Sequence, residues 1–221
     1  MRLNIDVILS IVETVAIVLV ATILHEMAHA GMAYALGDPT AKERGRLTLN
    51  PAAHLDPVGS ILLPVLMAAA GGPIFAFAKP VPYNPARLKN PVRDEVLVAL
   101  AGPACNLLQA IVGSLAFRAV LEFGLGGEHI YTLLEILSSY VYLNLMLMFF
   151  NLIPLPPLDG SAIVSPLLKG KARQSYYTIQ HYAMPVLLVL LFVVPSIVGF
   201  DPIGWYLHHT AGTLVYVMLG V

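Results

Sequence analysis

The sequence has few charges and almost no cysteine. Charged residues make up 11% of its 221 residues, whereas an average soluble domain has about 25%. So few charges cannot coat a water-facing surface, and a formal net charge of −1 offers no basic face to nucleic acid. The single cysteine, Cys105, excludes an internal disulfide and a thiolate metal cluster. Any metal site must therefore use histidine, aspartate or glutamate.

Apolar residues are abundant and gathered in long runs. They make up 58% of the chain, and the mean hydropathy is +0.79. A helix needs about 20 apolar residues to cross a bilayer core. Five runs qualify: residues 7–36, 95–123, 131–153, 183–198 with a few flanking residues, and 203–221. The sequence predicts an all-α polytopic membrane protein, a single domain over residues 1–221 with its core at 7–168 and accessory C-terminal helices at 179–221.

A sixth apolar run, residues 58–78, is broken by Pro64 and by Gly71-Gly72-Pro73. Breaks of this kind are typical of a segment that enters the membrane and returns, although the run is long enough to cross. If it returns, ten of the twelve lysines and arginines lie on one side of the membrane. The positive-inside rule then favours re-entry in a cell-membrane protein with its N-terminus outside and its C-terminus in the cytoplasm.

The first run carries the pattern H-E-x-x-H, from His25 to His29. Residues i and i+4 lie on one face of a helix, so the two imidazoles can bind one Zn²⁺. Glu26, beside the first ligand, is placed to take a proton from water. Ionisable residues inside a membrane helix are costly and usually functional. The alternative is a structural pair of histidines bonded to polar neighbours.

A catalytic zinc site has three protein ligands and one open position. The run at 131–153 contains Asn151 and leads into Pro154, Pro156, Pro157 and then Asp159-Gly160. The prolines predict an unwound backbone. We expect Asp159, at the end of this segment, to be the third ligand. It could also cap the short helix that follows.

These motifs resemble the site-2 protease family of intramembrane zinc metalloproteases, in its compact prokaryotic branch without a PDZ domain. H-E-x-x-H, then Gly102-x-x-x-Asn106, then Asn151 and Leu158-Asp159-Gly160 follow one another in the family's order. The broken run at 58–78 departs from the family's minimal three-helix core.

The resemblance implies one zinc ion per chain, held by His25, His29 and Asp159, with Glu26 as the general acid and base. It also implies that Asn151 lies near the scissile bond, and that Asn106 and Gly102 help to seat the substrate.

The implied function is cleavage of transmembrane segments of membrane proteins, at a site within the bilayer near its cytoplasmic face. Two alternatives stay open: a membrane protein that binds or transports zinc, and a catalytically inactive relative that binds membrane helices. Neither specifically needs Glu26. His54 is a further candidate, either as a partner of the metal site or as a turn histidine bonded to Asp56 or to the backbone.

Overall fold

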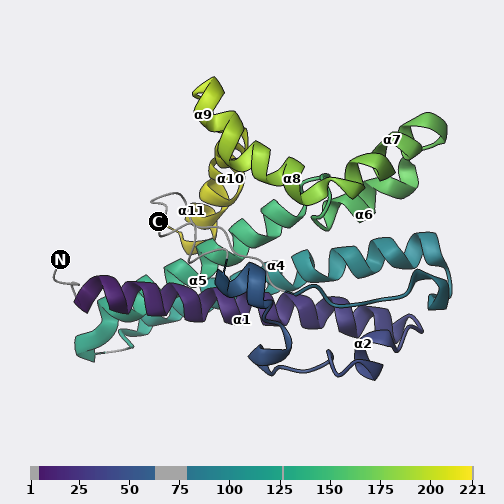
Figure 1. Cartoon of the computed structure of the whole chain (residues 1–221). Coiled ribbons are helices and arrows are strands. Elements are labelled where there is room, and N and C mark those ends of the chain that lie inside the picture. The colour runs from purple at the N-terminus through teal and green to yellow at the C-terminus, as the bar shows by residue number, and fades with distance from the viewer. Residues whose placement is uncertain (1–4, 63–78, 126, 221) are drawn as a thin grey trace.

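The computed structural model describes residues 5–62, 79–125 and 127–220. Every regular element in these ranges is helical, as the sequence predicts. Three long helices form the body of the molecule: α1 (Ile5–Ala35), α4 (Pro91–Phe123) and α5 (Ile130–Asn151) (Figure 1). All three contain a stretch long and apolar enough to cross a membrane.

The helix α4 lies antiparallel to both of its neighbours. Cys105 of α4 contacts the carbonyl of Leu24 in α1, and Gln109, one turn further on, contacts the earlier Ala21. An apolar core joins α4 and α5 to the C-terminal region, with Ala110, Phe117, Val141, Leu145, Met148, Ala211 and Leu219 buried in it. The helix α4 is terminated at Gly124, whose φ of 59° is left-handed and suits glycine.

Several short helices lie in the connection between α1 and α4, with α2 in contact with α1 and η3 in contact with α4. They are α2 (Thr40–Glu43), η1 (Pro51–Ala53), η2 (Pro57–Leu62) and η3 (Pro85–Arg87). The amide of Lys89 donates to the carbonyl of Leu36 at 3.4 Å and ties the two long helices together there. We call this the basic end of the body, because the basic residues of 42–46 and 87–93 lie at it. The distal end is where α4 stops and η4 (Gly127–His129) leads into α5.

Most of the run predicted to be re-entrant, at residues 63–78, lies outside the described residues. The described residues on either side of this run contact one another. The amide of Lys79 donates to the carbonyl of His54 at 2.9 Å, and the Arg46 guanidinium donates to the carbonyl of Lys79 at 2.6 Å. The backbone before and after the run is therefore held at one place, beside Arg46.

The C-terminal region differs from the prediction. After α6 (Gly160–Val164), η5 (Ser165–Leu167) and α7 (Gly170–His181), one helical segment comprises α8 (Ala183–Leu188), η6 (Val189–Val193) and α9 (Val194–Val198), and a second comprises α10 (Pro202–Leu207), η7 (His208–Gly212) and α11 (Thr213–Leu219). The two segments are bent by 103° from one another. The sequence predicted five full spans, whereas the described residues contain three such helices and a bent pair that adds at most one.

The last segment packs back onto the three-helix body. The Tyr206 hydroxyl donates to the carbonyl of Phe149, near the end of α5, at 3.4 Å. Ser114 and Arg118 of α4 both donate to the carbonyl of Met218 at 2.9 Å. The segment thus runs from the end of α5 towards the distal end, where α1 begins. The described ends of α1 and α11 therefore lie near the distal end of α4, and α8 and α9 project away from the body (Figure 1), while the sides of the membrane on which the termini lie stay a prediction.

Candidate metal centre

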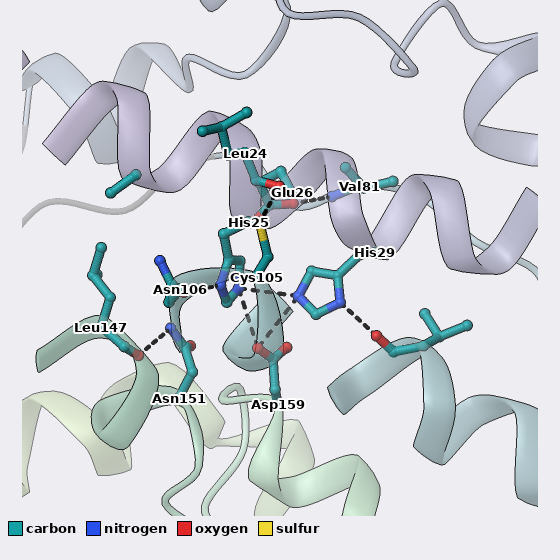
Figure 2. Close-up of polar contacts among 12 residues, drawn as sticks. Leu24, His25, Glu26, His29, Val81, Cys105, Asn106, Leu147, Asn151 and Asp159 are labelled. Atoms are coloured by element: carbon teal, nitrogen blue, oxygen red, sulfur yellow. Dashed lines mark hydrogen bonds and ion pairs between the residues drawn. The ribbon is translucent and has the colours of Figure 1, made fainter. Parts of the chain in front are cut away.

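Three side chains from distant parts of the chain converge beside α4. The Nε2 atoms of His25 and His29 lie 3.2 and 3.3 Å from Oδ2 of Asp159, and 3.0 Å from one another (Figure 2). One possible ligand atom from each residue lies within 4.8 Å of the other two. Across the part of the chain that the structure describes, this is the one group of its kind. The i, i+4 spacing on α1 brings the two histidines to one face.

Asp159 reaches the histidines through a set of tight turns. The helix α5 ends at Asn151, and the amide of Leu158 donates to the carbonyl of Leu155 at 2.9 Å within the segment that follows. Gly160 lets this segment pack against its own start, because a Cβ at that position would meet the carbonyls of Leu152 and Ile153. The glycine therefore helps to hold Asp159 where it is, and the helix α6 begins there.

The outer nitrogen of each histidine has a hydrogen-bond partner on α4. His29 Nδ1 lies 2.6 Å from the carbonyl oxygen of Val98, and His25 Nδ1 lies 2.5 Å from Oδ1 of Asn106. A carbonyl oxygen can only accept, so a proton must sit on each Nδ1. In the neutral imidazole, each Nε2 then directs a lone pair towards Asp159.

The ligand atoms of these three residues are suited to a zinc ion. Oδ2 of Asp159 is buried and has no hydrogen-bond donor among the described residues. Three lone pairs, two from imidazoles and one from a carboxylate, therefore meet in a buried place, where they are costly unless a cation lies among them. Two histidines and one carboxylate form a known ligand set of catalytic zinc, with the fourth position open.

Gly102 and Asn106 lie against the histidines. A Cβ at Gly102 would meet the imidazoles of both His25 and His29, so only glycine allows α4 to approach this closely. Asn106 is fully buried, at 0% exposure, and contacts His25 on one side and Asn144 on the other. Both ends of its amide have partners inside the protein, and its role in seating the substrate stays a prediction.

Glu26 stands apart from the three convergent side chains. It follows His25 on α1 and so points about 100° further round the helix. Its Oε2 accepts a hydrogen bond from the backbone amide of Val81 at 2.9 Å (Figure 2). The segment that supplies this amide, residues 79–84, has no helical or turn structure and lies beside α1.

The segment has two different edges. Alternate residues of an extended backbone direct their amides and carbonyls to opposite sides. Lys79 and Val81 direct theirs to the protein, where they meet His54 and Glu26. In an extended backbone Pro80 and Pro82 would face the opposite edge, and because proline has no N–H that edge would offer carbonyl oxygens and no donor at these two positions. We call it the acceptor edge.

Asn151 and His54 lie where their local backbone holds them. Nδ2 of Asn151 donates to the carbonyl of Leu147, one turn earlier in α5, at 3.0 Å (Figure 2). His54 is 2% exposed, and its Nε2 lies 2.7 Å from the carbonyl oxygen of Thr48. It is not part of the convergent group, so of its two predicted roles the structure gives it the contact with the backbone.

Two contributors to the site were missed from the sequence. Asn144 bonds to Asn106 and lies in the middle of an apolar run, where a buried amide is a signal of function. Val81 contributes through its backbone amide, and a backbone contact of this kind cannot be predicted from a side-chain pattern.

Comparison with known proteins agrees with this geometry. The model of peptidase family M50 matches residues 126–194, which include Asn151 and Asp159. A Bacillus subtilis protein named "Putative zinc metalloprotease YwhC" is 43% identical over 192 residues, covering 85% of this chain and 83% of its own length. The chain belongs to peptidase family M50, the site-2 proteases. This M50 peptidase is also 32% identical to "Putative zinc metalloprotease Rip2" of Mycobacterium tuberculosis over 196 residues, covering 88% of this chain and 72% of that protein.

No solved structure matches this M50 peptidase. Family membership confirms three predictions from the sequence: the resemblance itself, a zinc metalloprotease activity, and a multi-pass membrane protein. A transport protein, one of the two alternatives, is thereby set aside.

Proposed function

We propose that this M50 peptidase cleaves transmembrane segments of other proteins within the bilayer. The observation that carries the proposal is the position of the convergent group. His25 and His29 lie in the second half of an apolar helix long enough to cross a membrane, and His29 contacts Val98, two turns inside another. A peptide bond that reaches Asp159 and these histidines must itself lie at membrane depth.

The residues present suit peptide hydrolysis. Zinc held by His25, His29 and Asp159 would polarise the scissile carbonyl and make water more acidic. Glu26 accepts the proton of the attacking water through its second oxygen, while the Val81 amide holds the first, and then passes the proton to the leaving nitrogen. The Asn151 amide has a second N–H besides the one bonded within α5, and donates it to the carbonyl oxygen of the scissile bond.

The acceptor edge suits an unwound substrate. A helical segment must release its own backbone hydrogen bonds before a peptide bond can be attacked, and its freed amides then need acceptors. The carbonyls of Pro80 and Pro82 supply them beside Glu26, in the manner of strand addition. Substrates therefore bind here through their N–H groups.

An apolar cavity near the metal centre suits substrate side chains. Its volume is about 670 Å³, and it lies between the start of α4 and the α6–η5 region, with Pro91, Leu97, Ile163 and Leu167 in its lining. Leu97 precedes Val98, whose carbonyl holds His29. Apolar side chains of a membrane segment fit this lining better than charged ones do.

The basic end is the cytoplasmic one in this proposal. Residues 42–46 and 87–93 lie at that end, and the positive-inside rule assigns such clusters to the cytoplasm. The contact between His54 and Lys79 supports a position of both clusters on one side, as re-entry of residues 58–78 requires. The described ends of the chain, at α1 and α11, then both point towards the outer face.

The test begins with capture of substrates. Membrane proteins that co-purify from native membranes with the Glu26→Gln variant are reconstituted into liposomes with the wild-type protein, and the cut sites are mapped by mass spectrometry. We expect cuts inside transmembrane segments. Glu26→Gln should slow them by at least about 100-fold, the usual share of a general base, and retain zinc because the ligands are unchanged.

A matched control is Glu13→Gln, the same change on the same helix away from the three ligands. It should cleave at the wild-type rate. Cuts confined to extramembrane regions would overturn the intramembrane proposal, and a Glu26→Gln variant as fast as the Glu13 control would overturn the role of Glu26.

A further inference from the structure

A line of buried amides runs from His25 into the interface between α4 and α5. Oδ1 of Asn106 lies 2.5 Å from Nδ1 of His25, and Nδ2 of Asn106 donates to Oδ1 of Asn144 at 2.9 Å. Nδ2 of Asn144 donates in turn to the backbone carbonyl of Tyr140, also at 2.9 Å. Both asparagines are 0% exposed. The line therefore ends on a backbone group, without solvent access at either amide.

The backbone carbonyl gives this line a direction. A carbonyl oxygen only accepts, so Asn144 must present its NH₂ group to Tyr140 and its oxygen to Asn106. Asn106 must then donate to Asn144 and present its own oxygen to His25. That oxygen requires a proton on Nδ1 of His25, which leaves Nε2 with the lone pair.

We propose that Asn144 is a positioning residue of this M50 peptidase. It fixes the orientation of the Asn106 amide, and through it the tautomer of His25 that can bind a metal ion. The inference rests on the proposed metal ligation by His25. Asn144 itself touches neither ligand atoms nor substrate.

The two histidines reach the same tautomer by different routes. His29 donates directly to the carbonyl of Val98, which can accept only, so its tautomer needs no polar side chain. The partner of His25 is an amide, which presents either an acceptor or a donor depending on how it is turned. If Asn106 turned over, its NH₂ group would face Nδ1 of His25, and the imidazole proton would move to Nε2. A protonated Nε2 cannot bind zinc.

The decisive measurement is zinc affinity, by competition with a chelator, on the purified full-length protein. Asn144→Leu keeps a similar volume and removes the acceptor for Asn106. We expect it to weaken zinc binding by about 10- to 100-fold, the usual effect of losing a group that orients a ligand. The matched control is Tyr140→Phe, which removes a different hydrogen bond between the same helices, from the Tyr140 hydroxyl to Gln109 at 2.8 Å. The control should bind zinc as the wild type does.

A second background separates orientation from packing. In Asn106→Asp the partner of His25 becomes a carboxylate, which can only accept and so keeps the proton on Nδ1 without help from Asn144. Adding Asn144→Leu in this background should not weaken zinc binding by more than about twofold, the usual error of additivity, because Asn144 presents only its oxygen to that carboxylate. If Asn144 only packed α4 against α5, its substitution would lower zinc affinity by the same factor in both backgrounds.

Every variant is compared as the monodisperse fraction from size exclusion, with its helical content measured by circular dichroism. If Asn144→Leu gives no such fraction, Asn144→Ala takes its place with the same expectations. Wild-type zinc affinity in the Asn144 variant, or an equal loss in both backgrounds or in the Tyr140 control, would overturn the proposal. Because the readout is zinc binding, a failure to find cuts inside transmembrane segments would overturn the proposed function without touching this inference.

Discussion

The backbone amide of Lys79 donates to the carbonyl of His54 at 2.9 Å. The Arg46 guanidinium, from the turn after α2, donates a hydrogen bond to the carbonyl of the same lysine. A long apolar stretch of the chain thus begins and ends at one point, with basic residues close to both of its ends. A segment that crossed the membrane once would separate its ends by the thickness of the bilayer, about 30 Å.

Cysteine labelling from the two faces of the membrane tests this arrangement. With Cys105 replaced by alanine, single cysteines at Arg44 and Lys89 should react with an impermeant reagent from the same face. A cysteine at Glu128, in η4 at the distal end, should react from the opposite face. Labelling of the first two positions from opposite faces would contradict both the re-entrant segment and the proposed cytoplasmic basic end.

Asp159→Asn should release zinc. An amide oxygen is a weaker zinc ligand than a carboxylate, and the variant also lacks the charge that balances the ion. We expect the affinity to fall by at least about tenfold, the lower bound for losing even an indirect partner. Zinc content after dialysis against a chelator measures it, with Asp201→Asn as the control, since Asp201 caps α10 away from the site. Equal zinc retention in the two variants would remove Asp159 from the ligand set.

Gly102→Ala should displace the two imidazoles. The added Cβ would meet ring atoms of both His25 and His29, whereas alanine itself favours a helix by about 1 kcal/mol over glycine. The variant should therefore stay helical and lose zinc. Gly31→Ala, on α1 with nothing within 4 Å of the added Cβ, should keep both helix and zinc. Wild-type zinc affinity in Gly102→Ala would show that α4 does not limit the space around the histidines.

Asp38 should give the connection between α1 and residues 79–84 an acid-sensitive stability. Burial alone would raise the pKa of its carboxyl, but hydrogen bonds from Thr40 and Asn84 outweigh burial and lower that pKa. A lowered folded-state pKa means that the stabilisation is present above the unfolded value, about 3.9, and is lost as the pH falls through the folded value.

Asp38→Asn should therefore cost about 1.5–3 kcal/mol at neutral pH, the usual range for hydrogen bonds to a charged group. The difference from wild type should shrink below about pH 4, as the wild-type carboxyl takes up its proton. Limited proteolysis of the connection, carried out in detergent at a series of pH values, measures this difference in stability. A difference that stayed constant from pH 7 to pH 3 would contradict the assignment.

Sequence periodicity was sufficient for the parts of the site that lie within one element. The i, i+4 spacing placed His25 and His29 on one face, because a helix imposes that geometry locally. Asp159 could be predicted only from the need for a third ligand and from the family resemblance, because its position depends on turns and on Gly160 packing against a distant carbonyl. Asn144 shares no motif with its partner, so three-dimensional contact was needed to connect it with Asn106.

Apolar length predicted that helices exist but not how they run. Residues 183–198 and 203–221 are both apolar enough to be counted as spans, yet a left-handed Gly199 ends one segment and Asp201 caps the start of the next. The direction of the second segment depends on tertiary contacts such as that between Arg118 and Met218. Such contacts leave no trace in hydropathy, which is why apolar length did not predict the bend between these two segments.

The acceptor edge also limits what two copies of this chain can do to each other. Exposed backbone edges are common sites of aggregation, because identical strands can exchange hydrogen bonds along them. At Pro80 and Pro82 each copy has only carbonyl oxygens to offer, so two such edges have nothing to donate to one another. A pairing there needs a segment of different sequence that supplies the amides, and the two prolines thus disfavour pairing of this edge with the same edge of a second copy.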